Sequence, residues 1–234
     1  MMARRIYGGI SYGIGALLFL AYLWEILLPD TVVLPATRFF YLFGICLFVY
    51  IGTCLVGKTL GSRKEKKLRR VTFVFFFLLY LTLLFTFVWW DDFYGRNPSA
   101  GGFVWELDRD LLKRHLKTAL QLEPLGTVER YVFGYREGRV LFSTFARNIL
   151  GNLAVFIPLG FFLPILWKKQ RNFILFFLSA VFLSCLIEGV QLALMIGVCD
   201  IDDVILNTAG ALVSYGVFQI PPLKKKLRRM TGFS

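Results

Sequence analysis

Long apolar runs bounded by charged residues are the feature that most constrains how this chain folds. They cover about 6–28, 39–56, 71–90, 148–167, 172–196 and 204–220. A helix needs about 20 predominantly apolar residues to cross the hydrocarbon core of a bilayer. Backbone polar groups inside a bilayer must also be satisfied within the segment, which favours helices. We therefore expect an all-α, polytopic membrane bundle of about six transmembrane helices.

The basic residues gather at one set of ends of these runs. Two lie at the N-terminus, seven in 58–70, three in 168–171 and five in the basic tail after Pro221-Pro222, out of 27 in the chain. With six spans all four segments fall on the same side, and the positive-inside rule assigns that side to the cytoplasm. We expect a multi-pass protein of the cell membrane with both termini cytoplasmic. This distribution favours a membrane over a nucleic-acid partner, despite the net charge of +12.

A long polar segment, 91–146, separates the three spans of 1–90 from the three spans and basic tail of 147–234. It holds eight basic and eight acidic residues, so it lacks the basic excess of the cytoplasmic side and is expected to be extracellular. Leucines at helical spacing alternate with basic residues over 101–122. This pattern predicts an amphipathic helix on the outer membrane face. A helix of a small soluble subdomain fits the pattern equally well.

Polar side chains interrupt or border the last three runs, where each needs a partner or water. We expect them to line one pocket that opens to the outer leaflet and to serve as ligand-binding residues. Pro158 and Gly160 follow two of them and predict a kink with close helix packing. The predicted ligand-binding residues are Asn148, Asn152, Glu188, Gln191, Asp200, Asp202, Asp203 and Asn207.

The same residues support other interpretations. Amides in spans commonly join helices through hydrogen bonds, and acids at the start of a helix often cap it. Ionisable groups inside a membrane are instead functional as a rule, which makes Glu188 and Asp203 candidate catalytic acids or bases. Asp200, Asp203 and Glu188 are also candidate ligands of a divalent cation, the candidate cofactor.

At these residues the chain resembles the VanZ-like family of bacterial membrane proteins, over roughly 120–217. It departs from the family pattern at Leu125, where many relatives carry Phe, and at Gly197, where many carry Arg. If that Arg binds an anionic group in relatives, this chain binds such a group differently. The motifs that carry the resemblance are Leu122-Glu123-Pro124-Leu125-Gly126-Thr127-Val128, Asn148-x3-Asn152-x3-Phe156-x-Pro158-x-Gly160, Glu188-x2-Gln191 and Asp200-x-Asp202-Asp203-x3-Asn207-x2-Gly210.

The resemblance implies a Gram-positive cell-envelope protein that reduces sensitivity to teicoplanin-type lipoglycopeptide antibiotics. Our first hypothesis is a protein that binds or shields a membrane lipid or lipid-linked cell-wall precursor at the outer leaflet, with the lipoglycopeptide itself as a further candidate partner. The second is a membrane-embedded enzyme that acts on such a precursor through carboxylate or metal chemistry. The third is a small proton-coupled transporter, since three spans lie on each side of the long polar segment.

Overall fold

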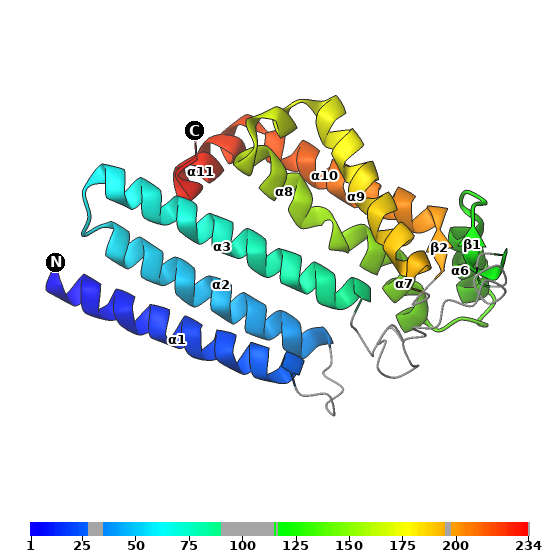
Figure 1. The fold of residues 1–234 in the computed structure, drawn as a ribbon, viewed down its shortest axis with the longest axis horizontal. Helices are drawn as coiled ribbons and strands as arrows, with labels where there is room; N and C mark the ends of the chain where they lie inside the picture. Colours follow the sequence, from blue (N-terminus) through cyan, green and yellow to red (C-terminus); the bar gives the residue numbers. More distant parts are fainter. Residues whose placement is uncertain (28–34, 90–114, 116, 195–197, 234) are drawn as a thin grey trace. The chain divides into compact units, whose positions relative to one another are not determined.

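The computed structural model describes residues 1–27, 35–89, 115, 117–194 and 198–233, and these are almost entirely helical (Figure 1). The chain divides into two compact units. The first unit holds residues 1–83 and 224–234, together with 92–95, and the second holds 84–91 and 96–223. The predicted all-α membrane bundle is confirmed.

In the first unit, α1 (Met2–Leu27), α2 (Pro35–Gly57) and the greater part of α3 (Ser62–Trp89) pack together. Their core is a buried apolar cluster of Tyr22, Leu42, Ile45 and Leu79. A chain of hydroxyls also crosses the three helices: the Tyr12 hydroxyl lies 2.9 Å from Thr53 Oγ1, which lies 2.7 Å from Thr72 Oγ1. These bonds satisfy polar groups that would otherwise be costly in an apolar interior.

The second unit is arranged around α10 (Ile201–Gln219), which packs against three neighbouring helices. The other elements of the unit are β1 (Leu120–Gln121), α6 (Gly126–Arg136), α7 (Phe142–Val155), α8 (Ile157–Leu166), η2 (Lys168–Arg171), α9 (Phe173–Ala193) and β2 (Cys199–Asp200). The two short strands pair in parallel, with Leu120 opposite Cys199 and Gln121 opposite Asp200. This pairing joins α6 to the start of α10, although the two segments are far apart in sequence.

Five helical segments among the described residues are long and apolar enough to cross a membrane. They are residues 2–25, 37–57, 62–86, 142–166 and 173–193. A sixth is counted when α10 is taken together with α11 (Pro221–Thr231), from which it is bent by 91°. The chain is a multi-pass membrane protein, as the apolar runs predict.

Several boundaries differ from the predicted ones. Residues 62–70, expected in a connecting segment, form the first turns of α3, because Lys, Arg, Glu and Leu favour helix and Glu65 pairs with Arg69 one turn later. The fourth span begins at Phe142 and breaks at Phe156, with Pro158 in the first turn of α8, where a missing N–H is tolerated. The basic tail after Pro221-Pro222 is itself a helix, α11.

Most of the amphipathic helix predicted over 101–122 lies outside the described residues. Where the structure describes this segment, 117–119 are helical and Leu120–Gln121 form β1 instead of continuing the helix to residue 122. The reason is tertiary: these two residues pair with Cys199 and Asp200, a partner that helical periodicity does not reveal. Gly197, the other departure from the family pattern, also lies outside the described residues.

Candidate functional site

Asp200 joins the end of α9 to the start of α10. It is the N-cap of α10, and its Oδ1 accepts a hydrogen bond from the Asp202 backbone N–H over 2.9 Å. Its own backbone N–H donates to Oε2 of Glu188 on α9, over 3.2 Å. Both carboxylates are buried. α10 therefore begins at Ile201, ahead of the predicted Val204, because the cap satisfies the backbone N–H groups that a helix start leaves unpaired.

Asp202 is completely buried and holds the first turn of α6. Its Oδ1 accepts from the Leu125 N–H over 2.5 Å, and its Oδ2 accepts from the N–H groups of Thr127 and Val128 over 2.8 and 2.9 Å. These donors are the ones that the start of α6 leaves without helical partners. Leu125 adopts φ 65°, a left-handed conformation that costs a non-glycine residue about 1 kcal/mol. Asp202 thus caps a helix that belongs to a distant part of the chain.

The polar residues of the last three spans lie in contact with one another. Asn152 on α7 donates a hydrogen bond from Nδ2 to Oδ1 of Asp203 on α10. Asn207 on α10 donates from its Nδ2 to Ser184 Oγ on α9, over 3.0 Å. The Asn207 Oδ1 is buried and makes no hydrogen bond to the described residues. Hydrogen bonds from amide side chains therefore connect α7 and α9 to α10.

Two glycines allow this close contact between helices. A Cβ at Gly210 on α10 would overlap the Leu153 carbonyl of α7. A Cβ at Gly160 on α8 would overlap Ser214 Oγ and come within 2.5 Å of the Ala211 carbonyl oxygen on α10. Small residues permit such backbone approaches in membrane helices. The predicted close packing at Gly160 is present.

Asn148 and Gln191 are the remaining predicted site residues. Asn148 donates from Nδ2 to the Thr144 carbonyl one turn earlier on its own helix, over 2.8 Å. Gln191 is buried on α9, one turn beyond Glu188. Asn148 thus bonds within α7 and does not share the contact that Asn152 makes with Asp203.

The candidate metal ligands do not form a metal-binding cluster. Among the described residues, no three His, Cys, Asp or Glu side chains are grouped so that they could hold a metal ion. One oxygen of Asp200 and one of Glu188 accept backbone hydrogen bonds instead. The arrangement of Asp200, Asp203 and Glu188 therefore does not fit the divalent cation that their clustering in sequence suggested.

Cys199 is a neighbour of this acidic group that sequence patterns do not single out. Burial raises the pKa of its thiol, and the charge of Glu188 raises it further, with smaller effects from Cys185, Asp200 and Asp203. The pairing of Cys199 with Leu120 places this thiol where β1 meets the start of α10.

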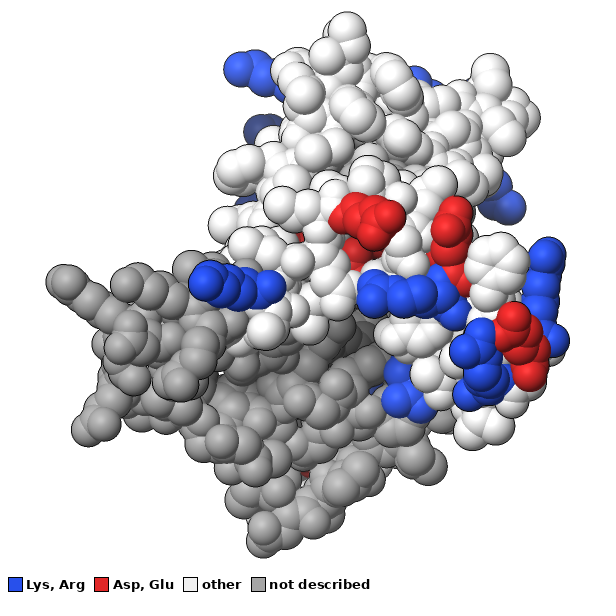
Figure 2. All heavy atoms as spheres, turned by 90° about the vertical axis from the view of Figure 1, so that its right-hand side faces the viewer, with Lys and Arg blue, Asp and Glu red and all other residues white. Residues whose placement is uncertain are grey.

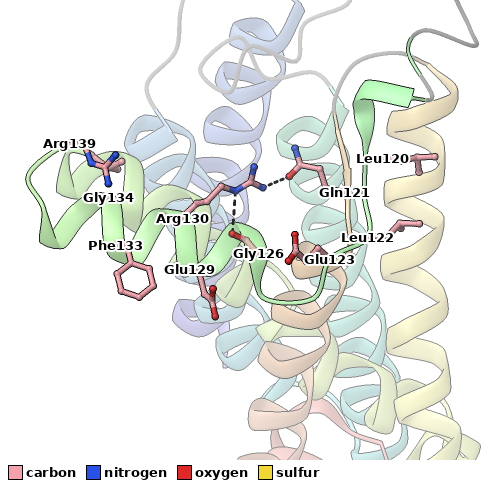
Figure 3. A pocket seen from close by; sticks show the side chains of 11 residues that line it. Leu120, Gln121, Leu122, Glu123, Gly126, Glu129, Arg130, Phe133, Gly134 and Arg139 are labelled. Carbon is pink, nitrogen blue, oxygen red and sulfur yellow. Dashed lines mark hydrogen bonds between the residues drawn. The ribbon is translucent and has the colours of Figure 1, made fainter.

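An open pocket of about 790 Å³ lies beside α6, the helix whose first turn is capped by Asp202 (Figure 3). It is lined by β1, the turn at 122–126, α6 and Arg139–Val140, all in the second unit. Gly134 closes the end of α6, where its carbonyl accepts from the Arg139 and Val140 N–H groups. The prediction placed the pocket among the polar residues of the last three spans. The open pocket lies on α6, whose first turn donates hydrogen bonds to one of those residues, Asp202, and the predicted pocket stays a prediction.

The pocket carries side chains of both charges. Arg130 is directed toward Gln121, and its Nη2 donates to Gln121 Oε1 over 2.5 Å and to Thr127 Oγ1 over 2.6 Å (Figure 3). Glu129 and Phe133, also on α6, are directed away from that pair. Acidic and basic side chains lie next to one another on the same face of the molecule (Figure 2). Such a surface suits a ligand that carries both a cation and an anion.

The pocket was missed from the sequence, although a signal for it was present. The stretch Leu122–Val128 was noted only because it resembles a family motif. The structure shows what this stretch does: its short turn, with Leu125 in the left-handed conformation, presents three backbone N–H groups to the carboxylate of Asp202. The motif at 122–128 and the motif that contains Asp202 are therefore joined by these hydrogen bonds.

Comparison with known proteins agrees with these motifs. The sequence model of the VanZ/LLP1 family matches residues 75–221. Protein VanZ of Enterococcus faecium is 32% identical over 110 residues, which is 44% of this chain and 68% of that protein. No solved structure matches this chain. The matched region contains the capped start of α6, the polar contacts between α7, α9 and α10, and the pocket. The chain belongs to the VanZ/LLP1 family.

Proposed function

We propose that this protein lowers the sensitivity of a bacterial cell to teicoplanin-type lipoglycopeptide antibiotics by binding a lipid-linked species at the outer leaflet. The observation that carries the proposal is membership of the VanZ/LLP1 family together with an open pocket in the matched region. The buried Asp202 of the family motif binds the backbone of the pocket wall, which favours a structural role over a catalytic one for this acid.

The orientation of the second unit supports an exterior pocket. The segment 142–166 leads from the end of α6 to the basic turn Lys168–Arg171, and α9 leads back to β2, which pairs with β1 (Figure 1). β1 and α6 line the pocket. The basic turn and the pocket thus lie at opposite ends of these helices. The positive-inside rule assigns the basic turn, and with it both chain termini, to the cytoplasm of a cell-membrane protein. Epitope tags at either terminus should resist protease in intact cells and be cleaved after permeabilisation.

The pocket chemistry suits the polar part of an amphiphile with groups of both charges. Arg139 and Arg130 offer guanidinium groups to a phosphate, and Glu123 and Glu129 offer carboxylates to an amine. Phe133 adds an exposed aromatic ring for an apolar portion. A lipid-linked cell-wall precursor combines phosphate, polar and lipid parts, and we infer that its polar portion occupies the pocket.

The test is antibiotic sensitivity in a Gram-positive host that lacks the protein. Expression should raise the inhibitory concentration of a teicoplanin-type compound more than that of a glycopeptide without an acyl chain. Phe133→Ala should abolish this protection, because it removes the aromatic surface of the pocket. Phe142→Ala is the matched control, since Phe142 is exposed to a similar degree and does not line the pocket.

Co-purified lipid supplies the direct readout. Mass spectrometry of the parent protein should detect a phosphate-containing lipid-linked species, and the Phe133→Ala protein should lose it while the Phe142→Ala protein keeps it. Equal protection by both variants at equal expression would exclude the pocket as the binding site. No protection by the parent protein would overturn the proposed function.

A further inference from the structure

Two strongly basic segments lie against each other in the first unit. One is the start of α3, and the other is α11 with the residues that follow it (Figure 1). Eight of their cationic side chains are exposed, and we name them the basic surface: Arg63, Lys64, Lys66, Lys67, Arg70, Lys225, Lys226 and Arg229. Their juxtaposition is a property of the fold, because more than 150 residues separate the two segments.

Specific contacts hold the two segments together. The Arg70 Nε donates to the Gly232 carbonyl over 2.7 Å, and the Phe73 and Phe233 rings meet edge to face at 5.7 Å. Gly232 adopts φ 72°, and a Cβ there would come within 2.7 Å of the Lys66 carbonyl oxygen. The end of the chain is thus seated on α3 through a turn that only glycine makes without strain.

The two segments that form the basic surface contain almost no acidic side chains to neutralise its charge. Glu65 is the single acid in 58–70, and its Oε1 already accepts from Arg69 over 2.7 Å. Residues 221–233 contain no acidic side chain. Like charges held close together repel one another, and the repulsion is relieved when anions from outside bind between them. The fold therefore assembles a site for an external polyanionic surface.

We propose that the basic surface binds the anionic headgroups of phospholipids in the adjoining leaflet. The start of α3 is one end of a membrane-spanning segment, so its cations lie near headgroup depth. α11 is amphipathic, with half-buried Leu223, Leu227 and Met230 at helical spacing along one stripe, as in helices that lie in the membrane interface. Clusters of four to eight basic residues at such a position attract acidic lipids. This inference is independent of the proposed antibiotic function.

The experiment uses the full-length protein, delipidated in a neutral detergent. Short-chain phosphatidylglycerol should bind and raise the thermal unfolding midpoint, and the same concentration of phosphatidylcholine should not. The triple variant Lys225→Gln, Lys226→Gln, Arg229→Gln should bind phosphatidylglycerol about tenfold more weakly or worse, because each basic residue near the surface adds to the attraction. The control variant Lys117→Gln, Arg136→Gln, Lys168→Gln removes three exposed charges elsewhere and should bind as the parent does.

A second variant separates an assembled surface from simple net charge. Phe233→Ala removes the ring contact with Phe73 and the stacking of Arg70 over the Phe233 ring, while all cations remain. It should weaken phosphatidylglycerol binding at unchanged net charge. Equal loss in the test and control triple variants, or equal response to both lipids, would overturn the proposal. Tighter binding of a single-stranded oligonucleotide than of phosphatidylglycerol would overturn it as well.

Discussion

The backbone N–H of Thr127 lies 2.8 Å from Oδ2 of Asp202, across 75 residues of sequence. Leu125 and Val128 donate to the same carboxylate. An acid that sequence patterns assign to a ligand site therefore accepts three backbone hydrogen bonds. Its charge strengthens these bonds, since hydrogen bonds to an ionised acceptor are about twice as strong as neutral ones. The motif around Asp202 thus stabilises the turn that borders the pocket.

Asp202→Asn should loosen the first turn of α6. The amide keeps one acceptor oxygen and places an NH₂ group against backbone donors, so we expect a loss of about 2–3 kcal/mol of stability. Hydrogen exchange over residues 122–130 should accelerate, and the thermal unfolding midpoint in detergent should fall. Glu129→Gln removes the same charge at an exposed position of α6 and is the matched control. Equal protection of 122–130 in both variants would contradict the capping role.

Gly210→Ala should prevent α10 from seating against α7. The added Cβ would meet the Leu153 carbonyl, which cannot move without displacing the backbone of α7. Overpacking of this kind costs about 1–3 kcal/mol or more. Size-exclusion profiles and unfolding midpoints measure the effect. Gly189→Ala on α9 is the control, because a Cβ there has no atom within 4 Å, and its profile should match that of the parent.

The contact between Asn152 and Asp203 should be energetically coupled. We expect a double-mutant cycle with Asn152→Ala and Asp203→Ala to give a coupling of about 0.6–2 kcal/mol, the range for polar contacts between membrane helices. Unfolding midpoints of the four proteins in one detergent supply the data. The same cycle on Asn148 and Asp203 is the comparison, because Asn148 bonds within α7. Additive effects of Asn152 and Asp203 would refute the predicted coupling.

The thiol of Cys199 should react slowly with iodoacetamide at neutral pH. Its pKa is raised by burial first and by Glu188 second, so less thiolate is present at a given pH. Glu188→Gln should lower that pKa and speed alkylation at pH values below the thiol pKa, because more thiolate is then present. The gain should vanish at high pH, where the thiol is ionised in both proteins.

This measurement requires Cys199 as the single cysteine, so Cys46, Cys54 and Cys185 are replaced by Ser in both proteins. Glu123→Gln removes an exposed carboxylate from the pocket lining and should leave the rate unchanged. A rate that Glu188→Gln leaves unaltered at every pH would show that Glu188 exerts no charge on Cys199.

The membrane bundle was predictable because hydrocarbon imposes one simple rule on sequence. A span needs about 20 apolar residues, and runs such as 172–196 stand out without any knowledge of tertiary contacts. Helix boundaries were less predictable, since Ser62 and Phe142 begin helices in segments whose polarity suggested connections. Apolar length reports the part of a helix inside the bilayer, and not the turns that continue beyond it.

The sequence indicated contacts between the polar groups of the last three spans and did not indicate the role of each group. The spacing of Asn152, Asp203 and Glu188 indicated that the last three spans would bring their polar groups together, and hydrogen bonds between these helices do so. The separate role of Asp202 depends on a turn far away in sequence, which helical periodicity cannot report. The pocket likewise depends on the pairing of Leu120 with Cys199, a two-residue contact too short to leave a pattern.

The hydrogen bond between Leu125 and Asp202 spans 77 residues, so the ribosome makes the turn at Leu125 well before the carboxylate that caps it. At about 5–20 residues per second, the ribosome makes the cap roughly 4–15 s after the turn that needs it. During that interval the residues of α7, α8 and α9 are synthesised, and the left-handed turn at Leu125 does not yet have the Asp202 carboxylate as a partner. The capped turn beside the pocket therefore forms only after residue 202 has been synthesised, late in the production of the chain.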